Sequence, residues 1–96
     1  ALPEDMLPGM VMIQRLRDAT LARTVVQALE ETGGPVVVIT GNGHARTDWG
    51  MPALLPEGLN VVSVAQLEAA PEGPQPHDVW VVTPPVARED PCAAFR

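Results

Sequence analysis

One uninterrupted stretch between two clusters of glycine and proline constrains this chain more than any other feature. The 96 residues include 11 prolines and 8 glycines, yet none of them falls between Met10 and Thr32. Both residue types are unfavourable inside helices, so the stretch predicts one long helix over residues 10–32. The segment Gly33-Gly34-Pro35 follows at once, as glycine and proline commonly do at a helix C-terminus. The rest of the chain has room only for short elements.

Three short apolar runs predict strands. They cover residues 36–39, 59–64 and 78–83. The first, Val36-Val37-Val38-Ile39, is continuous and β-branched, which is typical of a strand buried on both faces of a parallel sheet. We therefore predict an α/β fold with a partial mixed or parallel sheet and one long helix. A parallel sheet needs helices on both faces, so this layer is incomplete by itself.

The remaining segments predict turns and loops. Pro3, Pro8 and Gly9 indicate an irregular connector over residues 1–9, ahead of a domain spanning 10–96. Because the connector has neither an initiator methionine nor a helix or strand pattern, we interpret the chain as part of a longer protein. Single helical turns are expected at 52–55 and 65–70, and Trp80 is expected in the core.

Charge and composition exclude several classes of partner. Six arginines stand against twelve acidic residues, so the formal net charge is -6 at pH 7. Nucleic acids and anionic membrane surfaces both require a basic patch, and neither is expected as a partner. No apolar run reaches the roughly 18 residues of a transmembrane helix. Cys92 is the only cysteine, so no intrachain disulfide can form.

A group of polar residues shares one face of the predicted helix. Gln14, Arg17, Asp18 and Leu21 follow the spacing i, i+3, i+4 and i+7. Apolar residues on other sides of the helix indicate that it is largely buried. The polar group then has two interpretations, one wall of a pocket or an ordinary ion-paired helix end, and spacing alone favours the second.

The loop after the first predicted strand carries the best chemical candidate. Gly41, Asn42, Gly43 and His44 follow that strand directly, and ligands of open α/β sheets bind beyond the carboxyl ends of strands. Glycines let the backbone approach a ligand closely, and His44 offers a ligand, base or donor. An ordinary Asn-Gly turn with a structural histidine is the alternative interpretation.

Other chemically active residues are scattered. His77 lies in a proline-rich loop and is expected to be solvated, and Cys92 has no neighbouring base. Trp49 could line a pocket or pack in the core. No zinc-ligand cluster of recognised spacing is present. Methionine can ligate haem iron, but core packing is expected for Met10 and Met12.

Two ordered segments resemble one known family. The segment Gln14–Ala22, reading QRLRDATLA, resembles the Q-x-x-R-D-x-x-M/L-A helix of the ChaN-like haem-binding uptake family of the Tiki/TraB group. Residues 36–46, with Gly50-Met51-Pro52 after them, resemble the family's G-N-G-H…G-x-P segment. Asp90-Pro91-Cys92 is similar to a recurrent family ending. The order and spacing of the first two segments agree with the family.

The resemblance implies a fold, a site and a location. The chain would be the C-terminal part of a larger ChaN/Tiki-like domain in the bacterial cell envelope or periplasm. Its partners would be haem or another small ligand, together with the missing N-terminal half of the domain or an oligomeric partner. The implied cofactor-binding residues are Gln14, Arg17, Asp18, Gly41, Asn42, Gly43 and His44.

Three functional hypotheses follow. The preferred one is a haem- or iron-binding protein fragment that holds its ligand near the Gly41–His44 loop. The alternative is a metal-dependent hydrolase or peptidase of the Tiki/TraB type. His44 would then bind a divalent metal ion or act as acid and base, and Arg17 would stabilise developing negative charge. The third is a non-catalytic fragment that a partner completes, and whether the chain is an enzyme is left open.

Overall fold

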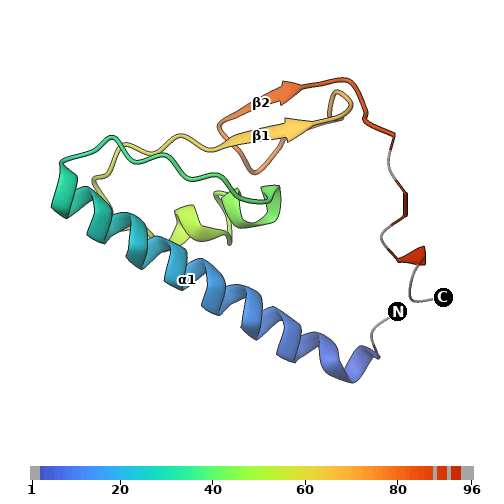
Figure 1. Ribbon diagram of the computed structural model, residues 1–96, viewed down its shortest axis with the longest axis horizontal. Coiled ribbons are helices and arrows are strands. Elements are labelled where there is room, and N and C mark those ends of the chain that lie inside the picture. Colours follow the sequence, from blue (N-terminus) through green and yellow to red (C-terminus); the bar gives the residue numbers. More distant parts are fainter. Residues whose placement is uncertain (1–2, 88, 91, 94–96) are drawn as a thin grey trace.

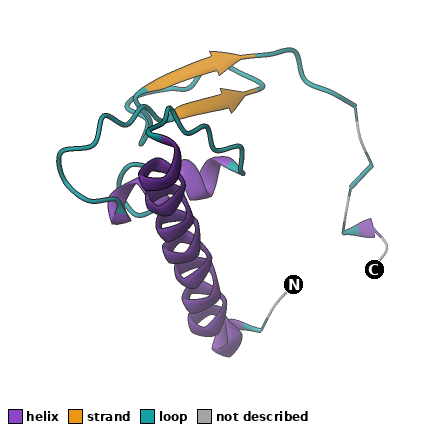
Figure 2. Cartoon of the chain, turned by 60° about the vertical axis from the view of Figure 1, so that its left-hand side comes forward, coloured by secondary structure: helices purple, strands orange, loops and turns teal. Residues whose placement is uncertain are grey.

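A single long helix and a two-stranded sheet lie on opposite sides of short helical turns (Figures 1 and 2). The computed structural model describes residues 3–87, 89–90 and 92–93. Helix α1 spans Leu7–Thr32, and strands β1 and β2 span Val64–Leu67 and Val79–Val82. Short 3-10 helices, η1, η2 and η3, cover Glu4–Met6, Asn42–Ala45 and Met51–Leu54. The predicted class, a small and partial α/β fold, is confirmed.

Helix α1 confirms the long helix and extends it at its start. The helix begins at Leu7 rather than Met10, because Pro8 lies in the first turn, where its missing N–H costs nothing. The irregular conformation expected over residues 1–9 is therefore wrong for residues 4–9, whereas the division into connector and domain stays a prediction. At the other end Gly33 adopts a left-handed φ of 78°, and its N–H donates to the Leu29 carbonyl over 2.8 Å.

The two strands pair in parallel, with Val64 opposite Val79 and Leu67 opposite Val82. The last predicted strand is confirmed, but the middle one is displaced from 59–64 to 64–67. The helical turn predicted over 65–70 is consequently wrong. Pairing begins at Ser63, whose carbonyl accepts hydrogen bonds from the N–H groups of Asp78 and Val79. A tertiary contact therefore decides where this apolar segment becomes a strand.

The buried strand predicted over residues 36–39 is wrong. Within the described part of the chain no segment pairs with it, and it is not a strand. Val37 is 82% exposed and Ile39 is 94% exposed, whereas Val36 and Val38 are half-buried. This alternation is typical of an extended segment with one face covered. Beta-branched residues favour the extended form, but a strand also needs a neighbour to pair with.

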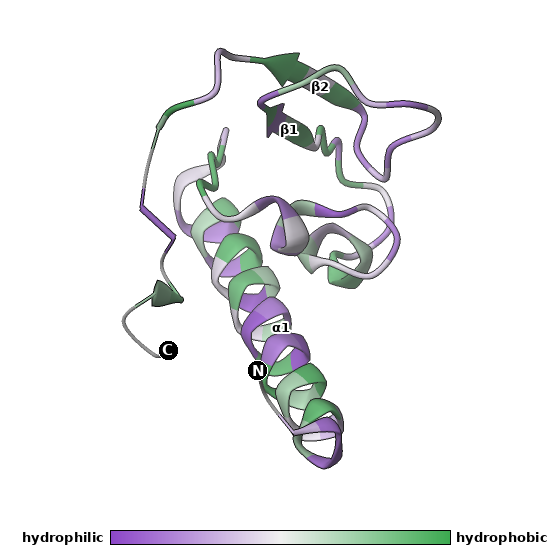
Figure 3. Ribbon diagram, turned by 90° about the vertical axis from the view of Figure 1, so that its right-hand side faces the viewer, coloured by the Kyte–Doolittle hydropathy of each residue, from purple (hydrophilic) through white to green (hydrophobic). Residues whose placement is uncertain are grey.

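The core is small and lies where the helical turns meet α1 and β1. Its buried apolar residues are Ala22, Met51 and Ala65. The first half of α1 stays open, with Met12, Ile13 and Leu16 exposed, so the expected burial of this helix is wrong (Figure 3). Trp80 is also exposed, at 45%, because nothing described covers that face of β2. No described helix combines the length and apolar character needed to cross a membrane.

The overall dimensions agree with this open arrangement. The radius of gyration is 15.9 Å, against about 12.5 Å for a compact domain of this length. The layers are therefore held together at a few points rather than by a continuous core.

Candidate ligand site at Asp18 and His44

Helix α1 and the loop after it meet at one short hydrogen bond. The Nδ1 atom of His44 lies 2.6 Å from the Oδ1 atom of Asp18. Asp18 comes from the polar face of α1 and is buried, with 5% of its surface exposed. His44 comes from η2, which is built by the Gly-Asn-Gly-His loop. The two sequence segments singled out separately therefore form one site.

The Asp18 carboxylate orients the His44 ring. An ionised carboxylate can only accept a hydrogen bond, so Nδ1 of His44 must carry the proton and donate it. In the neutral ring the lone pair is then on Nε2, the nitrogen at the other side of the ring. The side chain of His44 remains 24% exposed. Carboxylate groups commonly orient metal-binding histidines in this way.

Asn42 fastens the start of the loop to strand β1. Its side-chain Nδ2 donates to the Gln66 carbonyl over 2.9 Å, and the Gln66 N–H donates to its Oδ1 over 3.3 Å. The N–H of His44 also donates to the Gly41 carbonyl over 3.1 Å, which closes the 3-10 turn. These bonds place His44 relative to both the sheet and the helix.

A buried serine, which sequence reasoning missed, holds the next residue of the loop. The Ser63 hydroxyl donates to the carbonyl of Ala45 and accepts from Nδ1 of His77 over 2.9 Å. The Ser63 N–H donates to the Asp78 carboxylate over 2.7 Å. The expectation that His77 is merely solvated is therefore wrong. No local spacing pairs residues 45, 63 and 77, so only the tertiary fold identifies this contact.

The far end of the loop carries an ion pair between Arg46 and Asp48. Arg46 donates two hydrogen bonds to Asp48, over 2.9 and 2.7 Å. This side-chain hydrogen bonding holds the pKa of the Asp48 carboxyl below its ordinary value. The Arg46 guanidinium also lies 3.9 Å from the centre of the Trp49 ring, as in a cation–π contact. Trp49 itself is exposed, so of its two interpretations the packing in the core is wrong.

The remaining predicted site residues belong to the same two segments as Asp18 and His44. Gln14 is half-buried and Arg17 is exposed, and neither makes a hydrogen bond or ion pair to another described residue. Gly41 and Gly43 have open space where a side chain would begin. Among the described residues of the polar face on α1, only Asp18 forms a hydrogen bond with the loop. The ion-paired helix end proposed for Arg17 and Asp18 is not formed.

Metal-ligand groups are sparse in the described residues. No three histidine, cysteine, aspartate or glutamate side chains gather there in a way that could hold a metal ion. Cys92 is exposed and forms no disulfide. Of the methionines, Met51 is buried, whereas Met12 is exposed and does not pack in the core as expected. Pro91 of the family-like ending lies outside the described residues.

Comparison with known proteins identifies one family. A family model described as "Haem-binding uptake, Tiki superfamily, ChaN" matches residues 1–55, which is more than half of the chain. The match contains both partners of the Asp18–His44 pair and the segment that forms η3. No curated protein and no solved structure matches the chain.

The Asp18–His44 bond should contribute measurably to stability. We expect the double-mutant cycle of Asp18→Ala and His44→Ala to give a coupling energy of about 1–2 kcal/mol, because each variant removes one end of a partly buried hydrogen bond. Urea unfolding of the four proteins provides the measurement. The matched cycle of Arg17→Ala and His44→Ala should give no coupling. Equal coupling in both cycles would contradict the assigned bond.

Gly50 should tolerate no side chain. A Cβ at this position would lie 2.6 Å from the His44 carbonyl oxygen and 2.7 Å from that of Arg46. Both atoms belong to the backbone, so we expect Gly50→Ala to lower the free energy of unfolding by about 1–3 kcal/mol. NMR signals of the His44 ring should also shift, since its carbonyl must move. Gly41→Ala, which meets open space, is the control, and equal destabilisation by both would contradict the packing.

Proposed function

The chain belongs to the haem-binding uptake family named ChaN, in the Tiki superfamily, and on that premise we propose that it binds haem through His44. The observation that carries this proposal is the hydrogen bond between Nδ1 of His44 and Asp18. In the neutral imidazole, which is the form that binds iron, this bond leaves Nε2 as the unprotonated nitrogen. His44 would hold the haem, and bound haem would supply an iron centre.

The surroundings of His44 also fit such a ligand. Haem carries two propionates, and Arg17 is an exposed cation one residue before Asp18 that has no ion pair within the described chain. Arg46, by contrast, already binds Asp48. We therefore assign propionate recognition to Arg17, with Gln14 as a neutral donor one helical turn earlier. Open space at Gly41 and Gly43 lets a flat ligand approach the backbone of the loop.

We further propose that the chain acts in bacterial haem or iron uptake at the cell envelope. The family description, which names haem-binding uptake, supports the uptake role. A mononuclear metal centre for hydrolysis has less support. Among the described residues, no group of three metal-binding side chains that could hold a metal ion includes His44.

Removing the imidazole should abolish haem coordination. We expect the wild-type chain to shift the Soret band of added haem, and His44→Ala to leave the spectrum of free haem unchanged. Asp18→Ala keeps the ligand but loses its orienting carboxylate, so its affinity should fall by about 10–100-fold. Absorbance titration with haem measures all three proteins.

The matched control is His77→Ala. Nδ1 of His77 binds Ser63 away from the Asp18 contact, so this variant should keep the wild-type Soret shift. The same shift in His44→Ala as in the wild type would assign coordination to another residue and contradict the proposal. A wild-type chain that leaves the haem spectrum unchanged would contradict it as well.

A further inference from the structure

Ser63 joins a loop to the sheet with every polar group that it has. Its hydroxyl donates to the carbonyl of Ala45 and accepts from Nδ1 of His77 over 2.9 Å. Its N–H donates to the Asp78 carboxylate over 2.7 Å, and its carbonyl accepts from the Asp78 N–H over 2.9 Å. Only 4% of its surface is exposed. A buried residue with this many directional contacts has little freedom to move.

The hydrogen bonds of the Ser63 hydroxyl run in one direction. A backbone carbonyl can only accept, so the single hydroxyl proton points to Ala45. The hydroxyl oxygen is then left as an acceptor, and Nδ1 of His77 must carry a proton and donate it. Donation by His77 polarises the hydroxyl and strengthens its bond to Ala45. His77 therefore supports the bond to the loop, although the hydroxyl makes that bond by itself.

Two hydrogen bonds hold consecutive residues of the loop from different elements. Asp18 of α1 binds the ring of His44, and Ser63, where the pairing of the strands begins, binds the carbonyl of Ala45. Only the soft torsions of Ala45 lie between that carbonyl and the peptide group of His44. A shift of the carbonyl therefore moves the backbone that carries the His44 ring. The 2.6 Å between His44 and Asp18 is thus held from both sides.

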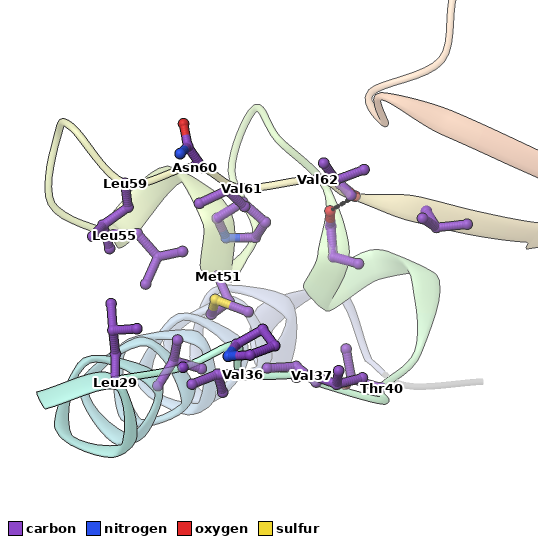
Figure 4. Close-up of a pocket in the computed structure, with 18 of the residues that line it drawn as sticks. Leu29, Val36, Val37, Thr40, Met51, Leu55, Leu59, Asn60, Val61 and Val62 are labelled. Atoms are coloured by element: carbon purple, nitrogen blue, oxygen red, sulfur yellow. Dashed lines mark hydrogen bonds between the residues drawn. The ribbon is translucent and has the colours of Figure 1, made fainter. Parts of the chain in front are cut away.

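The surroundings of the Ala45 carbonyl offer no charged replacement for the hydroxyl. Ser63 and Ala45 both line a cavity of about 820 Å³, which Figure 4 shows between residues 36–40 and 59–62. None of its described lining residues carries a charged side chain. Removal of the hydroxyl would therefore leave the Ala45 carbonyl without a cationic donor from this lining, and we expect the loop to shift.

We propose that Ser63 is a positioning residue for His44. Its hydroxyl holds the loop where Nδ1 of His44 lies within a short hydrogen bond of Asp18. Ser63 lies outside the segment that the family model matches, which ends at residue 55. The consequence for haem rests on the proposed function, since a firmly oriented ring offers Nε2 in one direction. The consequence for the Asp18–His44 bond needs no haem.

The proton between Asp18 and His44 reports on this positioning in the haem-free chain. We expect its NMR signal far downfield in the wild type, because the bond is short and one partner is ionised. Ser63→Ala removes only the hydroxyl, and the signal should move upfield as the bond lengthens. The bond from the Thr47 N–H to the Pro76 carbonyl remains in this variant and keeps the loop attached.

Ser63→Cys separates the hydrogen bond from packing. A thiol is of similar size to the hydroxyl but donates only weakly, so this variant should move the signal in the same direction, measured with a reducing agent present. It also provides the test if the alanine variant does not fold. A cysteine variant that keeps the wild-type signal would assign the role to packing and overturn the proposal.

The matched control is Asp78→Ala. It removes the carboxylate that binds the Ser63 N–H but leaves the hydroxyl, so it loosens Ser63 without freeing Ala45. Both alanine variants should unfold at lower urea concentration than the wild type, whereas only Ser63→Ala should move the His44 signal. A purely structural role of Ser63 would move the signal in both variants or in neither, and either result would overturn the proposal.

Haem titration tests the consequence for the proposed site. Ser63→Ala should bind haem about threefold to tenfold more weakly than the wild type, a smaller loss than for Asp18→Ala, because the hydroxyl acts through the backbone. Asp78→Ala should keep the wild-type affinity. Unchanged affinity in Ser63→Ala would overturn the consequence for haem. A wild-type chain that binds no haem would contradict the proposed function, whereas the His44 signal would still decide the role of Ser63.

Discussion

The hydrogen bond between Asp18 and His44 is a polar contact that joins the only long helix of the described chain to the loop that follows it. With so few buried apolar side chains, the layers are not held by a large core. Asp18 fixes the ring of His44, Asn42 fixes the start of that loop on β1, and Ser63 binds the loop again at Ala45. A series of directional bonds thus runs from helix to loop to sheet. This arrangement gives His44 a defined orientation that a hydrophobic contact alone would not provide.

Family membership and geometry support different parts of the functional argument. The family match covers residues 1–55 and therefore contains Asp18 and His44 but not Ser63, His77 or the strands. It provides the class of ligand. The geometry provides the residue proposed to bind it, because the Asp18 carboxylate leaves one ring nitrogen of the neutral His44 imidazole with its lone pair available. Neither source alone leads to the proposed coordination.

Local patterns in the sequence were sufficient for the long helix, its glycine end, the last strand and the polar helix face. These features depend on residues close together in the chain, such as Gly33 after Thr32 or Asp18 four residues after Gln14. The strand at 36–39 and the position of β1 could not be predicted in this way, because strands exist only through pairing. Tertiary contacts at Ser63 decide where β1 pairs, and the segment 36–39 finds no described partner. Only the tertiary structure brought Asp18 to His44 and Ser63 to Ala45 and His77, because hydrogen bonds between distant residues leave no periodic pattern in a sequence.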